Sequence, residues 1–212
     1  MNLIIRKALR KANSIRRNNF GGYLLNNRIK LLKHHDIQIL LDVGGNTGQF
    51  AYYTRKAGYQ NKIISFEPLS EAYVLLQAFA RNDAKWDTVN AAIGDEDGEI
   101  EINVSANLQS SSILDMMPEH VESAPDSAYK GKENVKIHKL DSIIDQYADN
   151  LEKTFLKIDT QGFEMNVLKG AEKSLKLLKG LQLELSMVEL YKGEKLFNDM
   201  LNYMIEMGFT VD

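Results

Sequence analysis

The chain has 212 residues, with 26 Lys and Arg against 29 Asp and Glu, 44% hydrophobic residues, three Pro and no Cys. This is the composition of an ordinary globular domain, and the lack of Cys excludes a disulfide scaffold and a cysteine-based zinc module. No apolar run approaches the roughly 18 residues that a membrane-spanning helix needs, and the N-terminus lacks the pattern of a secretory signal peptide, so we expect a cytoplasmic protein.

The charge is unevenly distributed along the chain. Residues 1–33 carry nine Lys or Arg and no Asp or Glu, which leaves 17 basic and 29 acidic residues for the remainder. An acidic body argues against nucleic acid as the main partner. Within residues 1–17, apolar positions recur at helical spacing between basic ones, so we predict a basic helical segment over residues 1–33. Such a helix either docks on the domain or makes peripheral contact with the inner face of an anionic membrane.

From residue 36 onward, short apolar runs alternate with helical patterns, which is typical of βαβ units and a mostly parallel sheet. We predict strands over 37–43, 62–68 and 88–93, with helices over 50–57 and 70–81 between them. Residues 95–135 break this rhythm. Residues 98–104 alternate as an antiparallel strand does and the rest is loop-like, so we predict an inserted hairpin or lid.

The rhythm returns with a strand over 135–140, a short helix over 141–148 and a strand over 155–160. One long helix is predicted next, because five apolar residues recur at helical spacing before Gly180: Val167, Leu168, Ala171, Leu175 and Leu178. A strand over 181–187, a helix over 196–207 and the start of a last strand over 208–212 complete the pattern. We therefore expect a doubly wound α/β domain over residues 34–212 with a truncated C-terminal strand.

The most informative segment is Asp42-Val43-Gly44-Gly45-Asn46-Thr47-Gly48, between a predicted strand and a predicted helix. Glycines there allow close approach of the backbone to a ligand, and a helix N-terminus favours an electronegative group. The spacing matches neither G-x-G-x-x-G nor a P-loop. A second acid, Glu67, ends the next strand, where it is suited to accept both hydroxyls of an adenosine ribose. Asp42 favours S-adenosylmethionine over NAD, because the methionine ammonium and carboxylate need donors and acceptors rather than a phosphate cradle.

With these features the chain resembles the FkbM-type class I S-adenosylmethionine-dependent methyltransferases, a family associated with O-methylation of small molecules and sugar hydroxyls. The matching segments, in the order of that family, are LLDVGGNTGQF, ISFEPLSEAY, VNAAIGDEDGEIEI, QSSSIL, KLDSIID, FLKIDTQGFEMNVLKGAEKSL and LQLELSMVELYKGEKLF. They cover most of residues 37–212 and imply a Rossmann-like methyltransferase sheet. The sequence departs from the family where Gly45 stands at a position at which Ala is common, and it ends before the family's last antiparallel strand.

The resemblance also implies S-adenosyl-L-methionine as the cofactor and a set of residues around it. These are Asp42, Gly44, Gly45, Asn46 and Gly48 near the methionine part, Glu67 at the ribose, Pro68, Asn90, Ala91 and Ala92 beside the adenine, and Asp159. An alternative role for Asp42 is that of a strand-end acid that caps backbone donors. Phe50 and Tyr52 are expected to pack the first helix rather than to touch a ligand.

Methyl transfer from a sulfonium is an in-line displacement, so alignment and exclusion of water supply much of the acceleration, and a positioned base assists a hydroxyl acceptor. Ligands of open α/β sheets bind at the carboxyl ends of the strands. The candidate catalytic residues there are Asp159, our first choice, and Glu184. Weaker candidates are Glu164, which the helix macrodipole already explains, Glu189 and His138.

Two further features limit the chemistry. Asp159 and Glu184 could converge, but two carboxylates are too few to predict a metal site, and we predict none. The segment Asp159-Thr160-Gln161-Gly162 lacks the Asp/Asn-Pro-Pro-Tyr/Phe motif usual in enzymes that methylate nucleic-acid bases. Ser110–Ser112, in the irregular segment, could close over cofactor and acceptor as a lid.

We therefore predict an S-adenosylmethionine-dependent O-methyltransferase that acts on a hydroxyl of a glycan or small metabolite. Two alternatives stay open: an NAD-linked Rossmann oxidoreductase, and a binding module that keeps the cofactor pocket without turnover. If the N-terminal segment binds a membrane, a lipid-linked glycan becomes an attractive acceptor. The pattern carries no signal for the oligomeric state.

Overall fold

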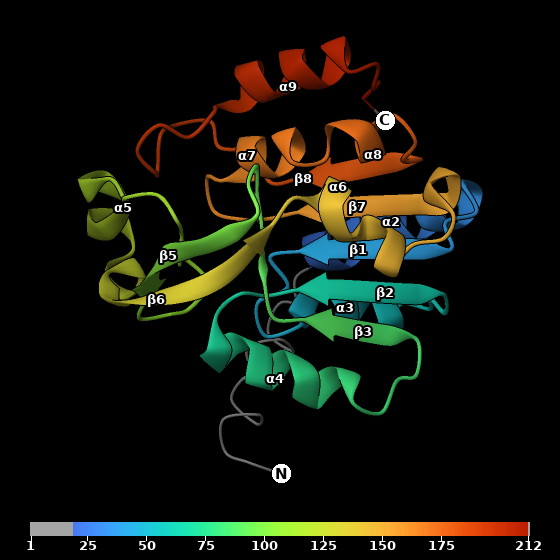
Figure 1. The fold of residues 1–212 in the computed structure, drawn as a ribbon, viewed down its shortest axis with the longest axis horizontal. Coiled ribbons are helices and arrows are strands. Elements are labelled where there is room, and N and C mark those ends of the chain that lie inside the picture. The colour runs from blue at the N-terminus through green and yellow to red at the C-terminus, as the bar shows by residue number, and fades with distance from the viewer. Residues whose placement is uncertain (1–18, 212) are drawn as a thin grey trace.

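The computed structural model describes residues 19–211, which form a five-stranded parallel sheet covered by helices (Figure 1). Across the sheet the strands are β3 (Trp86–Val89), β2 (Lys62–Phe66), β1 (Ile39–Val43), β7 (Thr154–Ile158) and β8 (Gly180–Leu183). Every neighbouring pair is parallel. The chain moves outward from β1 to β3 on one side and then from β7 to β8 on the other. The predicted doubly wound α/β fold is confirmed, with its switch point between β1 and β7.

Helices cover both faces of the sheet. The described helices, of which α5 belongs to the insertion, are α2 (Asn19–His34), α3 (Gln49–Lys56), α4 (Ser70–Ala80), α5 (Pro118–Ser123), α6 (Leu140–Ile143), α7 (Glu164–Lys169), α8 (Glu172–Leu175) and α9 (Phe197–Glu206), with 3₁₀ turns at Pro125–Ser127, Ile144–Gln146 and Leu151–Lys153. None of these helices is long and apolar enough to cross a membrane, within the part of the chain that the structure describes.

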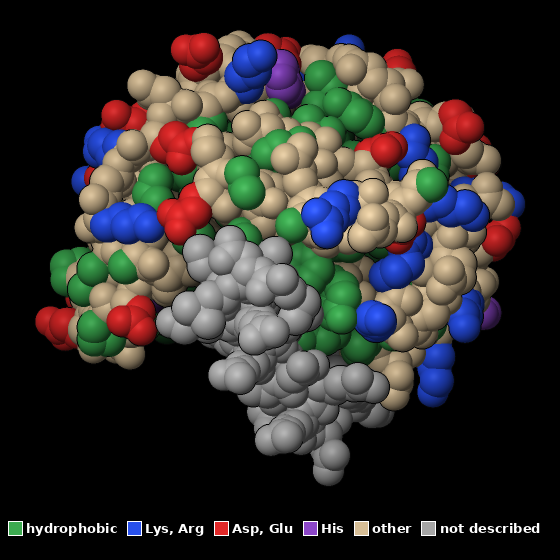
Figure 2. Space-filling model, turned by 90° about the horizontal axis from the view of Figure 1, so that it is seen from below, with side chains coloured by type: hydrophobic (Ala, Val, Ile, Leu, Met, Phe, Trp, Pro, Cys, Tyr) green, Lys and Arg blue, Asp and Glu red, His purple; other side chains and the backbone are tan. Residues whose placement is uncertain are grey.

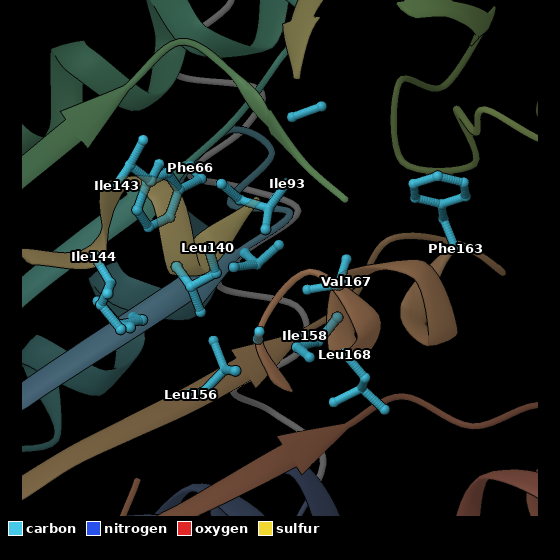
Figure 3. Close-up of a cluster of buried hydrophobic side chains, with 14 of the residues drawn as sticks. Phe66, Ile93, Leu140, Ile143, Ile144, Leu156, Ile158, Phe163, Val167 and Leu168 are labelled. Atoms are coloured by element: carbon cyan, nitrogen blue, oxygen red, sulfur yellow. The ribbon is translucent and has the colours of Figure 1, made fainter. Parts of the chain in front are cut away.

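The core consists of two apolar clusters, one on each face of the sheet. Alternate residues of β1 point to opposite faces, so Leu40 packs with Leu32 of α2 and Leu76 of α4, whereas Leu41 belongs to the other cluster. That second cluster includes strand residues of β7 and residues of α6 and α7 (Figure 3). Because both faces are buried, the strands read as continuous apolar runs rather than as alternating ones.

A small second sheet carries the predicted inserted hairpin. Its strands are β4 (Ala92–Ile93), β6 (Tyr129–His138) and β5 (Gly98–Ser105), in that spatial order. β5 and β6 pair antiparallel, as predicted for residues 98–104. The hairpin and α5 lie beyond the end of the parallel sheet towards which β1, β2 and β3 point (left in Figure 1). The insertion therefore extends from the edge at which the strands end.

The prediction of one strand over residues 88–93 is wrong. β3 ends at Val89, and β4 leaves the main sheet to pair with β6 instead of β2. The side chain of Asn90, between the two strands, donates hydrogen bonds to the carbonyl oxygens of Glu67 and Pro68 at 2.9 Å each. These bonds fix the point at which the chain turns out of the sheet.

The prediction of one long helix up to Gly180 is also wrong, because the segment forms two short helices, α7 and α8. The carboxylate of Asp141 accepts hydrogen bonds from the backbone N–H groups of Lys173 and Ser174, which begins α8 separately. At the break, a side-chain carbon on Gly170 would lie 1.7 Å from the carbonyl oxygen of Gly94, so the two backbones touch. Gly180 begins β8 rather than ending a helix.

The C-terminal end of the chain differs from expectation, whereas most of the predicted N-terminal segment is not described. Residues 208–211 form no strand; Phe209 instead donates its backbone N–H to the carbonyl oxygen of Met204 and closes α9. The predicted basic helix over residues 1–17 lies outside the described residues. Of the segment 1–33, the structure describes α2, whose Ile29 and Leu32 are buried against the sheet.

Candidate active site

A cavity of about 520 Å³ opens at the carboxyl ends of the parallel strands, beside the switch point. Its volume falls within the range of about 300–1,000 Å³ that is usual for small-molecule sites. Its wall is formed by the ends of β1, β2 and β7 with the turns that follow them, and by residues 108–113 of the insertion, which we call the strap. Loops after strand ends at a switch point are where doubly wound folds bind their ligands.

The glycine-rich turn after β1 is held by the strand ends on both sides. The backbone N–H groups of Gly44 and Gly45 donate to the carbonyl oxygen of Phe66 at 3.1 and 2.9 Å. Gly44 has φ of +74°, and a side-chain carbon there would lie 1.8 Å from the carbonyl oxygen of Asp159. Only glycine fits this position, because it must adopt a left-handed conformation in contact with a neighbouring backbone.

Glu67 lies in the wall of the cavity and is only 4% exposed. One carboxylate oxygen accepts the backbone N–H of Asn46 at 2.7 Å, and the other accepts that of Leu69 at 2.9 Å. Burial raises the pKa of Glu67 to about 7, although these two hydrogen bonds favour the ionised form. A carboxylate has about four acceptor positions, so two remain for a ligand.

Asp42 does not reach the cavity, because it pairs with a buried lysine that the sequence did not single out. The ammonium nitrogen of Lys157 lies 3.0 Å from Asp42 Oδ1 and 3.5 Å from Asp159 Oδ2, and it donates to the carbonyl oxygen of Gly44 at 3.0 Å. Burial alone would lower the pKa of Lys157, but the two carboxylates raise it above its ordinary value. Lys157 therefore stays charged and ties the glycine turn to β7. The one sequence signal for it is a lysine inside the apolar strand FLKI.

The two predicted catalytic residues come together in the wall of the cavity. The side-chain nitrogen of Gln161 lies 2.8 Å from Asp159 Oδ1 and 3.4 Å from Glu184 Oε2. A hydrogen bond to Asp159, burial and the charge of Asp159 raise the pKa of Glu184 to about 8. Burial opposes the charge on Asp159, but Lys157, Glu184 and Gln161 together lower its pKa. These opposite shifts favour the protonated form of Glu184 and the ionised form of Asp159.

The strap is fastened to both sides of the cavity. Asn46 donates its side-chain N–H to the carbonyl oxygen of Leu108 at 3.2 Å, and Ser112 donates its hydroxyl to the carbonyl oxygen of Gln161 at 2.7 Å. The buried Tyr191 places its hydroxyl 3.2 Å from the carbonyl oxygen of Ser110. The structure thus places the predicted lid residues 110–112 over the cavity.

The structure brings most of the predicted cofactor residues to one cavity. Those in its wall are Gly44, Gly45, Asn46, Glu67, Pro68, Ala91, Ala92 and Asp159. The three that do not line it are Asp42, which pairs with Lys157; Asn90, which holds the chain after β3; and Gly48, which has φ of +87° and begins α3. These three residues therefore support the structure around the cavity and do not form its wall.

The remaining candidates divide in the same way. Glu164 accepts the backbone N–H of Thr160 at 2.8 Å and so closes the turn after β7. Glu189 accepts the backbone N–H of Gly193, and Nδ1 of His138 lies 3.5 Å from Oδ1 of Asp97. Neither of these residues lines the cavity, and Glu164 does not line it either. Phe50 packs against the apolar cluster that contains Leu40 and also lines the cavity, because α3 begins at the cavity edge. Among the described residues, no group of three or more His, Asp or Glu could hold a metal ion.

Fold and site together define a Rossmann-like α/β protein with a ligand cavity at its switch point. The family model described as the methyltransferase FkbM domain matches residues 42–211, so the chain belongs to the FkbM methyltransferase family. It is 28% identical over 157 residues to the methyltransferase sdnD of Sordaria araneosa. The match covers 63% of this chain and 60% of that protein, so the chain spans about three fifths of this relative's length.

A solved structure from Clostridium thermocellum, described as a "putative rRNA-methylase", is also similar. It is 12% identical and has a TM-score of 0.37, with coverage of 86% of this chain and 80% of that one.

Proposed function

We propose that this chain is an S-adenosylmethionine-dependent O-methyltransferase that acts on an uncharged hydroxyl acceptor, a glycan or a small metabolite. The observation that carries the proposal is the position of Glu67. It is a desolvated carboxylate in the wall of the cavity, one strand away from the glycine turn, and it retains acceptor capacity. An acid placed there can accept both hydroxyls of an adenosine ribose.

The neighbouring wall suits the rest of such a ligand. Beyond Glu67 the wall is apolar, with Pro68, Ala91, Ala92 and Ile93, and can take the flat face of an adenine. The turn at Gly44–Asn46 and the ionised Asp159 supply backbone groups and a carboxylate at the other side. A ligand with a cationic ammonium and sulfonium fits this negative surface better than a pyrophosphate does, because pyrophosphate needs a cluster of donors or cations.

The chemistry asked of the protein is modest. When bound, S-adenosylmethionine would be held by Glu67 and the turn at Gly44–Asn46 and would supply a methyl group, carried on a positively charged sulfur, to the acceptor oxygen. In this proposal Asp159 receives the hydroxyl proton, because it lines the cavity and its lowered pKa favours the ionised form. The strap excludes water from the space between the two ligands.

The charges of the wall favour a neutral acceptor over a phosphorylated one. Among the described residues that line the cavity, Lys157 is the one cation, and Asp42, Asp159 and the carbonyl oxygen of Gly44 already occupy it. Gln49, Gln109 and the strap serines supply neutral donors and acceptors instead. Sugar hydroxyls match such groups, whereas a phosphate would meet carboxylates.

Peripheral membrane contact through residues 1–17 belongs to the proposal as an extension, on the strength of their basic amphipathic sequence. If anionic liposomes sediment the full chain and the chain lacking residues 1–17 equally well, this extension is wrong.

The proposed reaction is tested by mass spectrometry with S-adenosylmethionine that carries a trideuterated methyl group. The acceptors are a panel of neutral saccharides and hydroxylated metabolites, with the matching sugar phosphates as controls. We expect deuterated methyl ethers from neutral acceptors only, and a rate about 100-fold lower for Asp159→Asn, in line with the loss of a positioned base. Transfer to the phosphorylated set alone, or undiminished transfer by Asp159→Asn, would contradict the proposal.

A further inference from the structure

Gln161 occupies a strained position in the turn between β7 and α7. It has φ of +56°, in the left-handed region that residues other than glycine seldom adopt. The next residue, Gly162, has φ of +96°, and a side-chain carbon there would lie 2.9 Å from Cβ of Tyr191. Strain of this kind persists where the surrounding contacts hold it, and it is found preferentially at functional sites.

The contacts of Gln161 leave its side-chain amide with one orientation. Its nitrogen faces the carboxyl oxygens of Asp159 at 2.8 Å and of Glu184 at 3.4 Å, and these oxygens can accept its two protons. Its oxygen lies 3.1 Å from the hydroxyl of Tyr191, which is a donor. If the amide were turned over, its nitrogen would face the hydroxyl and its oxygen would face two carboxyl groups, with repulsion at the shorter contact.

The same residue is joined to the strap. Its backbone carbonyl oxygen accepts a hydrogen bond from the hydroxyl of Ser112 at 2.7 Å. The hydroxyl of Tyr191 lies within hydrogen-bond distance of both Gln161 Oε1 and the carbonyl oxygen of Ser110, so it links Gln161 to the strap. Gln161 is thus the one described residue whose contacts reach both carboxyl groups and the strap. Tyr191 is 2% exposed, so it is a fixed point for these contacts.

We propose that Gln161 is a positioning residue, whose side-chain amide, oriented by Tyr191, aligns the carboxyl groups of Asp159 and Glu184 and keeps their shared proton on Glu184. Donation to Asp159 stabilises its ionised form, which is the form that can receive a proton. The consequence for the reaction rests on the proposed function, whereas the placement of the proton does not.

Other charged groups act on the same pair and stay constant in the test. Lys157 of β7 favours the ionised form of both carboxyl groups, and Glu164 of α7 disfavours the ionised form of Glu184. The ammonium nitrogen of Lys157 lies 3.5 Å from Oδ2 of Asp159. Neither Lys157 nor Glu164 changes in the Gln161 variant, so a shift in the titration midpoints of Asp159 and Glu184 is attributed to Gln161.

The proposal is tested by carbon NMR titration of the side-chain carboxyl groups in the full chain without ligand. Signals of Asp159 and Glu184 are assigned from Asp159→Asn and Glu184→Gln. Gln161→Met keeps the length of the side chain and removes its donor, so we expect the Asp159 midpoint to rise by about one pH unit. Tyr191→Phe is expected to give a smaller rise in the same direction.

Tyr129→Phe is the matched control. Tyr129 also fastens the insertion, by donating its hydroxyl to the carbonyl oxygen of Leu114 at 2.8 Å, but it does not contact Gln161. It should leave both midpoints unchanged. Unchanged midpoints in a folded Gln161→Met would overturn the proposal. Should that variant fail to fold, unchanged midpoints in Tyr191→Phe would do so.

Turnover gives a second, separate readout. Once an acceptor is identified, we expect Gln161→Met to lower kcat about tenfold and to move the pH dependence of kcat to higher pH. The KM for S-adenosylmethionine should stay unchanged. A loss confined to KM would contradict a positioning role. Absence of any methyl transfer by the wild-type chain would refute the proposed function, yet the NMR titration would still decide whether Gln161 places the proton.

Discussion

Two buried acids at the switch point, Asp42 and Glu67, differ in how their charge is compensated. Asp42 is fully buried, with a lysine ammonium at 3.0 Å and the hydroxyl of Ser65 at 2.9 Å. Glu67 has only two backbone N–H groups as close partners. Asp42 is therefore part of the framework, whereas Glu67 is available to gain further hydrogen bonds from a ligand.

The role of Lys157 as partner of Asp42 gives a first prediction. Lys157→Met should lower the free energy of unfolding by about 3–5 kcal/mol, because Asp42 is left as an uncompensated buried charge. Urea unfolding measures this loss. The double variant Lys157→Met/Asp42→Asn should recover much of it, and a single variant as stable as the wild type would show that the pair has no such role.

A second prediction concerns the pH dependence of binding to Glu67. Ribose hydroxyls donate to an ionised carboxylate, and burial holds the pKa of Glu67 at about 7 in the free protein. Binding therefore favours deprotonation, so affinity for S-adenosylhomocysteine should fall as the pH drops below 7, by up to about tenfold per pH unit. Calorimetric titrations over this range test it.

Glu67→Gln is the informative variant for this pH dependence. An amide cannot accept the backbone N–H groups of both Asn46 and Leu69, so we expect weaker binding and a flat pH profile. A profile in Glu67→Gln as steep as that of the wild type would assign the titration to another group.

At the scale of single elements, the sequence predicted most strands and helices and erred where distant contacts decide. The apolar residues at helical spacing over 167–178 do face the core, since Val167, Leu168 and Leu175 are all buried. The helix is nevertheless divided, because Asp141, far earlier in the chain, caps α8. No local pattern contains that information, and the same holds for Tyr191, whose contacts with Gln161 and Ser110 come only from the fold.

The glycine turn gives a prediction at this scale, with a matched control elsewhere in the chain. In Gly44→Ala, the left-handed φ of +74° strains the backbone and the new side-chain carbon overlaps the carbonyl oxygen of Asp159. We expect the two effects together to lower the free energy of unfolding by about 3 kcal/mol or more. In Gly58→Ala, φ is +104° but no atom lies within 4 Å, so backbone strain of about 1–2 kcal/mol remains. Thermal unfolding of both variants tests this order, and equal losses would contradict the close packing of the turn.

At the scale of the whole molecule, the sequence predicted the doubly wound sheet because the alternation of apolar runs and helices extends along most of the chain. It also predicted that the glycine turn and Glu67 lie close together, since both follow strands whose ends meet, and both line the cavity. The described part of the face in Figure 2 carries both acidic and basic side chains, with several Lys and Arg towards its right side and an apolar patch near its centre.

The carboxyl groups of the site also predict how the stability of the ligand-free chain depends on pH. The pKa values of Glu67 and Glu184 are raised to about 7 and about 8, so the folded state holds protons that the unfolded state has lost. Unfolding releases these protons, and stability should therefore fall as the pH rises from about 5 to about 8. Urea midpoints should show a smaller fall in Glu184→Gln, and the same fall in both proteins would argue against the raised pKa of Glu184.

The most direct test of the central claim, that the cavity binds S-adenosylmethionine through Glu67, is isothermal titration of the full chain with S-adenosylhomocysteine and, separately, with NADH. We predict that S-adenosylhomocysteine binds, that NADH does not, and that Glu67→Gln weakens the binding at least about tenfold through the loss of a charge-assisted contact. Binding of NADH, or binding of S-adenosylhomocysteine that Glu67→Gln leaves unchanged, would contradict the account.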